Sequence, residues 1–109
     1  MRAKTIVSLT TALLWLALSP NALSQIVQGQ DALYVRSLAA SCANCHGTDG
    51  KAEPGSLVVS LAGMDKNYFI EQMKAFKAGT RPATVMTQIG KGFNDVQIEA
   101  LATYFAAQK

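Results

Sequence analysis

The stretch Cys42-Ala43-Asn44-Cys45-His46-Gly47 decides the fold, because it holds both cysteines and the single histidine of this chain. Two thiols three positions apart, followed directly by an imidazole, form the pattern by which haem is attached covalently to protein. Each cysteine can form a thioether with one of the two haem vinyl groups. The next residue then lies under the iron, where a neutral imidazole is the usual fifth ligand. The motif therefore predicts Cys42 and Cys45 as attachment points and His46 as the proximal iron ligand.

Three other uses of the two cysteines are less compatible with the sequence. A thioredoxin-like redox motif needs the cysteines at the start of a helix within alternating strands and helices, and no segment here has a strand pattern. A structural zinc site needs four Cys or His ligands, and Cys42, Cys45 and His46 are the whole supply. A disulfide between residues three apart closes only a very small loop, so it constrains little of the unfolded chain.

Residues 1–24 predict a secretory signal peptide. A short basic start precedes an apolar run over residues 6–18, and a segment with small side chains follows. We expect cleavage between Ser24 and Gln25. The apolar run is shorter than the roughly twenty residues that span a bilayer, so no membrane anchor is expected after processing. The sequence thus predicts export to the periplasm of a soluble chain, residues 25–109.

Charge and length indicate one small domain with no affinity for nucleic acid. The formal net charge of the chain is +3, and loss of Arg2 and Lys4 with the leader reduces it to about +1. The remaining basic residues form no cluster. Residues 25–109 contain no repeat, low-complexity tract or linker, so a second domain is not expected. A domain of this size is short of hydrophobic core, and a covalent haem can supply part of it.

Three main helices are expected in residues 25–109. The first runs from about Asp31, as N-cap, to Cys42, and so delivers the haem motif at its end. The second lies between Asp65 as N-cap and Gly79 as the terminating residue. The third opens at Asn94, with Gln97 as a candidate reciprocal partner in a capping box. Its expected buried stripe comprises Ile98, Leu101, Ala102 and Phe105.

The segment 47–64 is expected to be an irregular loop that wraps the cofactor. It holds four glycines and one proline, which disfavour a regular element. Its apolar side chains are expected to face the porphyrin: Leu57, Val58, Val59 and Leu61.

The sixth position on the iron determines the chemistry. A strong-field side chain there makes an electron carrier, whereas an open site permits oxygen chemistry or ligand sensing. With the only histidine already used, methionine is the natural candidate. Met73 belongs to the apolar stripe of the second helix, and Met64 directly precedes a helix cap, so packing is the ordinary reading of both. Met86 lies in an expected non-helical segment between two helices and is our predicted distal ligand, with Met64 as the alternative.

Four stretches together resemble class I c-type cytochromes: Cys42-Ala43-Asn44-Cys45-His46-Gly47, Leu61-Ala62-Gly63-Met64, Lys77-Ala78-Gly79-Thr80-Arg81-Pro82-Ala83-Thr84-Val85-Met86, and Leu101-Ala102-Thr103-Tyr104. Within that class, the run from Met64 to Phe105 is most similar to the cytochrome subunit of flavocytochrome c sulfide dehydrogenase and its small monohaem relatives. Members of that subunit group can carry two haem halves, and this chain has one haem motif.

The resemblance implies a small all-α class I cytochrome c fold, with three main helices and loops around one covalent haem c and with the first and last helices crossing. It implies periplasmic electron transfer without catalysis, with His46 and Met86 on the iron, as haem subunit or redox partner of a flavoprotein (FAD) that oxidises sulfide. A free-standing carrier is the alternative. If Met86 does not bind iron, a five-coordinate haem sensor or peroxidase is the remaining reading. The sole tryptophan, Trp15, lies in the leader, which leaves four candidates for bonding the haem propionates: Tyr34, Tyr68, Tyr104 and Arg81.

Overall fold

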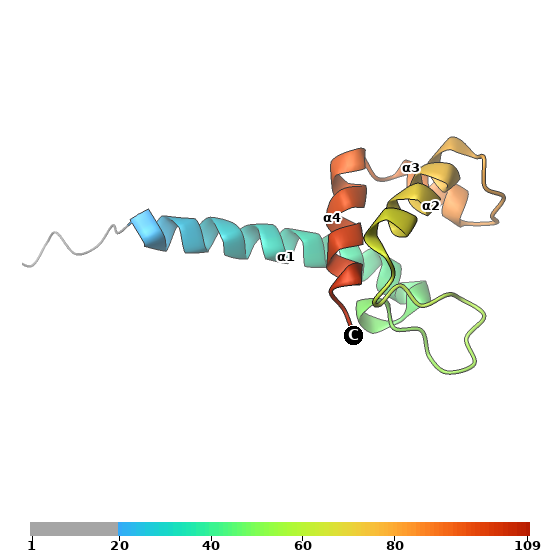
Figure 1. The fold of residues 1–109 in the computed structure, drawn as a ribbon, viewed down its shortest axis with the longest axis horizontal. Helices are drawn as coiled ribbons and strands as arrows, with labels where there is room; N and C mark the ends of the chain where they lie inside the picture. The colour runs from blue at the N-terminus through green and yellow to red at the C-terminus, as the bar shows by residue number, and fades with distance from the viewer. Residues whose placement is uncertain (1–19) are drawn as a thin grey trace, which may run out of the picture. The chain divides into compact units, whose positions relative to one another are not determined.

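The computed structural model describes residues 20–109, and within them the chain is helical with no strand (Figure 1). The elements are α1 (Pro20–His46), the 3₁₀-helix η1 (Thr48–Gly50), α2 (Lys66–Ala78), α3 (Met86–Lys91) and α4 (Asp95–Ala106). The all-α architecture expected from the sequence is therefore confirmed for this range. Residues 1–19, which make up most of the expected signal peptide, lie outside the described residues.

The first helix is longer than expected. α1 begins at Pro20 and ends at His46, so Asp31 lies inside it and the prediction of Asp31 as N-cap is wrong. Proline is favoured in the first turn of a helix, because its missing N–H has no intrahelical partner there and its φ is already helical. Gly29 weakens the following stretch without ending the helix. The expected cleavage position between Ser24 and Gln25 falls within α1, where the side chains of residues 21–25 are exposed.

The chain divides into two compact units at Asp31. In the first unit, residues 20–31 are described, and the side chains described there are exposed. The second unit, Ala32–Lys109, contains the rest of α1, the other helices and the buried core. None of the helices in residues 20–109 has both the length and the apolar character needed to cross a membrane.

The core of the second unit is built on α4. Phe105, Ile98 and Leu101 are its largest fully buried side chains. The whole buried cluster comprises Ala39, Leu61, Phe69, Met73, Ile98, Leu101, Ala102 and Phe105. The expected buried stripe of the last helix is thus confirmed. Since Ala39 belongs to this cluster and the Tyr34 hydroxyl accepts a hydrogen bond from Gln97 Nε2 at 2.8 Å, α4 crosses the C-terminal part of α1, as the resemblance implied (Figure 1).

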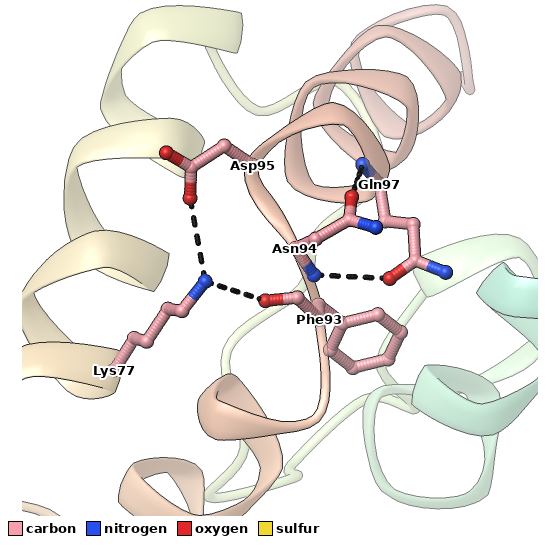
Figure 2. A network of polar contacts seen from close by, with 5 residues as sticks. All are labelled: Lys77, Phe93, Asn94, Asp95 and Gln97. Atoms are coloured by element: carbon pink, nitrogen blue, oxygen red, sulfur yellow. Dashed lines mark hydrogen bonds and ion pairs between the residues drawn. The ribbon is translucent and has the colours of Figure 1, made fainter.

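The ends of α2 and α4 follow the sequence signals. Asp65 caps α2 by accepting a hydrogen bond from the Tyr68 N–H at 2.9 Å, and Gly79 ends it in the left-handed conformation at φ 75°. At the start of α4, Asn94 Oδ1 accepts from the Gln97 N–H and Gln97 Oε1 accepts from the Asn94 N–H (Figure 2). This is the capping box that the sequence predicted.

Candidate functional site

The last turns of α1 bring the three predicted haem-binding residues together. Cys42, Cys45 and His46 are spaced i, i+3 and i+4, so they share one side of the helix end. Both cysteines are free thiols; Cys42 is half-buried against the core cluster and Cys45 is exposed. Two unpaired thiols next to an imidazole are the donor set that covalent haem attachment requires.

The position of the thiols disfavours a redox role for them. They lie at the C-terminal end of a helix, where the helix dipole disfavours a thiolate, whereas reactive dithiols lie at helix N-termini. Burial raises the pKa of Cys42, partly offset by a hydrogen bond with Ser41. A protonated, half-buried thiol is a poor redox nucleophile, so the structure disfavours the thioredoxin-like alternative.

His46 is oriented by a backbone carbonyl. Its Nδ1 lies 2.6 Å from the Val59 oxygen. A carbonyl oxygen can only accept, so the proton of the neutral ring is on Nδ1 and the lone pair on Nε2 is free to bind a metal. The histidine is therefore held in the tautomer that an iron ligand needs. Sequence reasoning named Val59 only for its apolar side chain and did not predict this contact, because every residue has a carbonyl and no side-chain pattern marks this one.

Gly47 turns the chain immediately after the histidine. Its φ is 87° and ψ is 162°, a region that is essentially restricted to glycine. A Cβ there would lie 1.7 Å from the Lys51 carbonyl oxygen. The turn is closed by hydrogen bonds from the Gly47 N–H to the Ala43 oxygen at 3.0 Å and from the Gly50 N–H to the Gly47 oxygen at 2.9 Å. The motif therefore needs its glycine for both conformation and space.

A polar contact ties this turn to α4. The Tyr104 hydroxyl donates to Asp49 Oδ1 at 2.6 Å, and Asp49 has a positive φ of 53°. The hydrogen bond to Asp49 raises the pKa of Tyr104, and burial and the charge of Asp49 act in the same direction. Because its proton is already committed to Asp49, Tyr104 is a weaker candidate for a haem propionate.

Two of the other propionate candidates also have protein partners. Tyr34 is bonded to Gln97, as described above. Arg81 donates to Gln72 Oε1, and its guanidinium lies 4.6 Å from the centre of the Phe76 ring. The Tyr34 hydroxyl can still donate a hydrogen bond, and the Arg81 guanidinium has further N–H donors, so both stay candidates for a haem propionate.

Exposed apolar side chains lie on the loop that contacts His46 and on the segment at α3. Leu57 is fully exposed at 103% and Val59 is 62% exposed. On the segment before and within α3, Val85 is 55% exposed and Ile89 37%. An apolar porphyrin face would cover such side chains, so they fit a haem. The expectation that Leu61 also faces the porphyrin is wrong, because Leu61 is 7% exposed and packs within the core.

The three methionines beyond the leader have different environments. Met73 is 5% exposed within the core, which confirms the packing interpretation. Met86 is the first residue of α3, so the expectation of a non-helical segment is wrong at this residue. Short-range hydrogen bonds from residues 88 and 89 to the Val85 carbonyl form the helical turn there. Both Met86 and the alternative ligand Met64 are half-buried against the cluster that Cys42 also contacts.

The described residues contain no group of three or more His, Cys, Asp and Glu side chains that could enclose a metal ion. With Nδ1 bonded to the Val59 carbonyl, His46 offers a metal one nitrogen, Nε2, which suits a metal that brings most of its own ligands. A porphyrin does so, since it provides the four equatorial nitrogens and leaves two axial positions to the protein.

No family model matches the chain, but it has curated relatives. It is 38% identical over 71 residues, 65% of this chain and 33% of the relative, to a thiosulfate dehydrogenase electron acceptor from Thiomonas intermedia. It is 40% identical over 68 residues, 62% of this chain and 60% of the relative, to a cytochrome subunit of sulfide dehydrogenase from Chlorobaculum tepidum. It is 32% identical over 72 residues, 63% of this chain and 86% of the relative, to cytochrome c-554(548) from Halomonas halodenitrificans.

A solved structure agrees with these matches. Cytochrome c4 from Acidithiobacillus ferrooxidans is similar with a TM-score of 0.57 and 36% identity, over 61% of this chain and 37% of that chain. The all-α fold is confirmed by this similarity. The chain spans only 33% and 60% of the length of the Thiomonas and Chlorobaculum relatives.

Proposed function

The chain belongs to the class I c-type cytochromes, and we propose that it carries single electrons through one haem c, with His46 and Met86 as axial ligands. Cys42 and Cys45 form the two thioethers, each thiol adding its sulfur and its hydrogen across one vinyl group. The observation that supports this most directly is the geometry at the end of α1. There, two free thiols precede a histidine whose Nδ1 is bonded to the Val59 carbonyl, which leaves Nε2 for the iron.

The residues around the site have separate tasks in this mechanism. When bound, the haem supplies an iron that alternates between the ferrous and ferric states. The Val59 carbonyl holds the His46 ring in one orientation, and the thioethers prevent the cofactor from dissociating. Met86 would offer the iron a neutral sulfur, which favours the ferrous state and would raise the reduction potential. With both His46 and Met86 as ligands, little rearrangement would accompany the gain or loss of an electron.

The proposed partner is a flavoprotein that oxidises sulfide, with this chain as its haem subunit or redox partner. The support is the name of the Chlorobaculum relative, a cytochrome subunit of sulfide dehydrogenase. The Thiomonas relative is named as an electron acceptor of thiosulfate dehydrogenase, which is a different donor within sulfur chemistry. A free-standing carrier is the alternative for this chain.

We propose that residues 1–24 direct the chain to the periplasm and are removed there. The exposed side chains of residues 21–25 support this, because their removal takes nothing from the core. The N-terminal sequence of the protein from its native host tests the cleavage position, and a mature chain that does not begin at Gln25 would contradict it.

Visible spectroscopy of the wild type, Met86→Leu and Met64→Leu tests the ligand set. We expect the wild type to show the weak long-wavelength charge-transfer band of methionine on ferric haem. Met86→Leu should lose that band and bind carbon monoxide rapidly when reduced, and Met64→Leu should behave as the wild type. Loss of the band in Met64→Leu instead would transfer the ligand role to Met64. Rapid carbon monoxide binding by the wild type would favour the five-coordinate sensor or peroxidase.

Copurification tests the partner. The protein is isolated from its native host and the fraction is assayed for flavin and for haem reduction by sulfide. We expect a flavin-containing chain in the same fraction and reduction of the haem on addition of sulfide. A pure monomer that sulfide reduces no faster than it reduces free haem peptide would favour the free-standing carrier.

A further inference from the structure

The helix that carries Met86 is too short to be stable alone. α3 has six residues, and Val85 at its N-cap provides no side-chain hydrogen bond. Isolated helices below about 12–15 residues are marginal even with good helix formers. The position of Met86, the first residue of α3, therefore depends on what the rest of the fold does to this helix.

One constraint is a close backbone approach at Gly90. Gly90 is buried, and a Cβ there would lie 3.1 Å from the backbone nitrogen of Lys77 and 3.4 Å from the backbone oxygen of Met73. Gly90 follows Met86 by four positions, so the two residues lie on the same side of α3. The end of α3 thus lies directly against the last turn of α2.

The second constraint is the side chain of Lys77, from the same last turn of α2. Lys77 Nζ donates to the Phe93 carbonyl oxygen at 2.8 Å and lies 3.3 Å from Asp95 Oδ1 (Figure 2). Phe93 lies between α3 and α4, and its side chain packs against the core cluster. The lysine therefore joins the end of α2 to the segment that leaves α3.

The two bonds of Lys77 are not equivalent. The Asp95 side chain is 69% exposed, so its ion pair with Lys77 is screened by water and contributes little. The bond to the Phe93 carbonyl is partly buried and has a charged donor, which makes it the stronger of the two. Its loss would leave a half-buried carbonyl without its lysine donor.

We propose that Lys77 is a positioning residue for the sixth iron ligand: its bond to the Phe93 carbonyl holds α3 against α2 and thereby keeps the Met86 sulfur on the iron. This inference rests on the proposed ligation by Met86. Phe93 is tied to α3 by the hydrogen bond from its N–H to the Gly90 oxygen at 3.3 Å, so the lysine bond favours the arrangement in which α3 lies against α2 and Met86 is on the iron. We call the bond between Lys77 and the Phe93 carbonyl the clamp. Lys77 acts through this bond and not by contact with Met86.

The affinity of the ferric protein for imidazole reports how firmly Met86 is held on the iron, because imidazole must displace Met86 to bind. Lys77→Met keeps most of the aliphatic chain and removes the donor, and we expect imidazole to bind about tenfold more tightly to it. Lys74→Met is the matched control, since it removes the same charge from an exposed position of the same helix. It should change the affinity less than about twofold. Lys77→Arg, which retains a donor, should restore most of the wild-type affinity, and Asp95→Asn should resemble the control.

Two results would overturn the proposal: an imidazole affinity of Lys77→Met equal to that of the wild type, or equal increases in Lys77→Met and Lys74→Met. If Lys77→Met fails to fold with haem, Lys77→Gln replaces it, because its shorter side chain does not reach the Phe93 carbonyl. Met86→Leu separates the two claims. If it retains the wild-type ferric spectrum, ligation by Met86 is wrong; if it loses the methionine band while Lys77→Met binds imidazole as the wild type does, only the clamp is wrong.

Discussion

The two sides of the candidate site are held by different kinds of contact. At the end of α1, the turn after His46 is closed within a few residues, by bonds such as that from the Gly47 N–H to the Ala43 oxygen at 3.0 Å. On the other side, α3 is held by the close approach of Gly90 to α2 and by the bond from Lys77 to Phe93, which are 16 residues apart. The turn after His46 is thus closed by local bonds, to which Val59 and Tyr104 add longer-range contacts. The helix α3 is positioned by tertiary contacts with α2.

This difference has consequences for the two proposed axial ligands, His46 and Met86. Short-range contacts close small loops and cost little chain entropy, so the attachment turn can form with its helix. The position of α3 requires a folded α2 and α4, and a helix held mainly from outside opens at lower free energy than the core. We therefore expect the segment around His46 to be rigid and α3, which carries Met86, to open more easily. Four experiments test this difference.

Replacing both cysteines should have the largest effect. Without Cys42 and Cys45 no thioether can form, so Cys42→Ala with Cys45→Ala should contain no covalent haem. Mass spectrometry of the denatured protein should give the apoprotein mass. Ser41→Ala, next to the motif, is the control and should retain the haem mass. A haem adduct on the double variant would refute the attachment sites.

Gly47→Ala should destabilise the attachment turn severely. The new Cβ would overlap the Lys51 oxygen and the backbone would be strained, so we expect the free energy of unfolding to fall by about 3 kcal/mol. Gly55→Ala is the matched control, because Gly55 also has a positive φ, 84°, but nothing lies within 4 Å of its Cβ position. It should cost about 1 kcal/mol. Urea unfolding measures both, and equal costs would show that the close contact with Lys51 is unimportant.

Hydrogen exchange should distinguish the two sides directly. In Met86→Leu we expect the amides of α3 to exchange at least about tenfold faster than in the wild type, because the helix has lost its ligand bond. The amides of residues 42–46 should change less than about twofold, since their contacts are local. A uniform increase across both segments would show that they unfold together.

Tyr104→Phe should have the smallest effect and a pH dependence of known sign. Loss of the bond to Asp49 should lower the free energy of unfolding by about 1 kcal/mol near neutral pH. The pKa of Tyr104 is raised in the fold, so its stabilising contribution is present below the pKa of the unfolded chain and is lost as pH rises through the folded value. Urea unfolding of wild type and variant at about pH 7 and about pH 11 should show the difference shrinking at high pH. Asp49→Asn keeps an acceptor for the Tyr104 hydroxyl, so it should lose less stability at neutral pH than Tyr104→Phe does. A difference in unfolding free energy between wild type and Tyr104→Phe that grows with pH would contradict the assignment.

Sequence reasoning succeeded where a structural signal is contained in one or two helical turns. The caps at Asp65, Gly79 and Asn94 and the buried stripe of α4 were all predicted, because each depends on residues three or four positions apart. It was wrong about the start of α1, because Asp31, the expected N-cap, lies inside a helix that already includes Pro20. It also missed α3, whose six residues provide too little periodicity to recognise.

For the site, the motif identified Cys42, Cys45 and His46 as the donor set, but the expected helix ended at Cys42, whereas α1 continues to His46. The contacts that orient these residues were not predictable. Val59 orients His46 through a backbone oxygen 13 residues away, and Tyr104 reaches Asp49 across 55 residues. Neither partner is marked by a pattern in the chain.

The sequence by itself determined the donor set and the helices that are capped by their own neighbours, because thiol spacing and capping act over a few residues. The orientation of the His46 ring and the position of α3, which begins at Met86, are visible only in the folded structure. Those features depend on packing between segments far apart in the chain, since the loops that join them must be closed before any such contact exists.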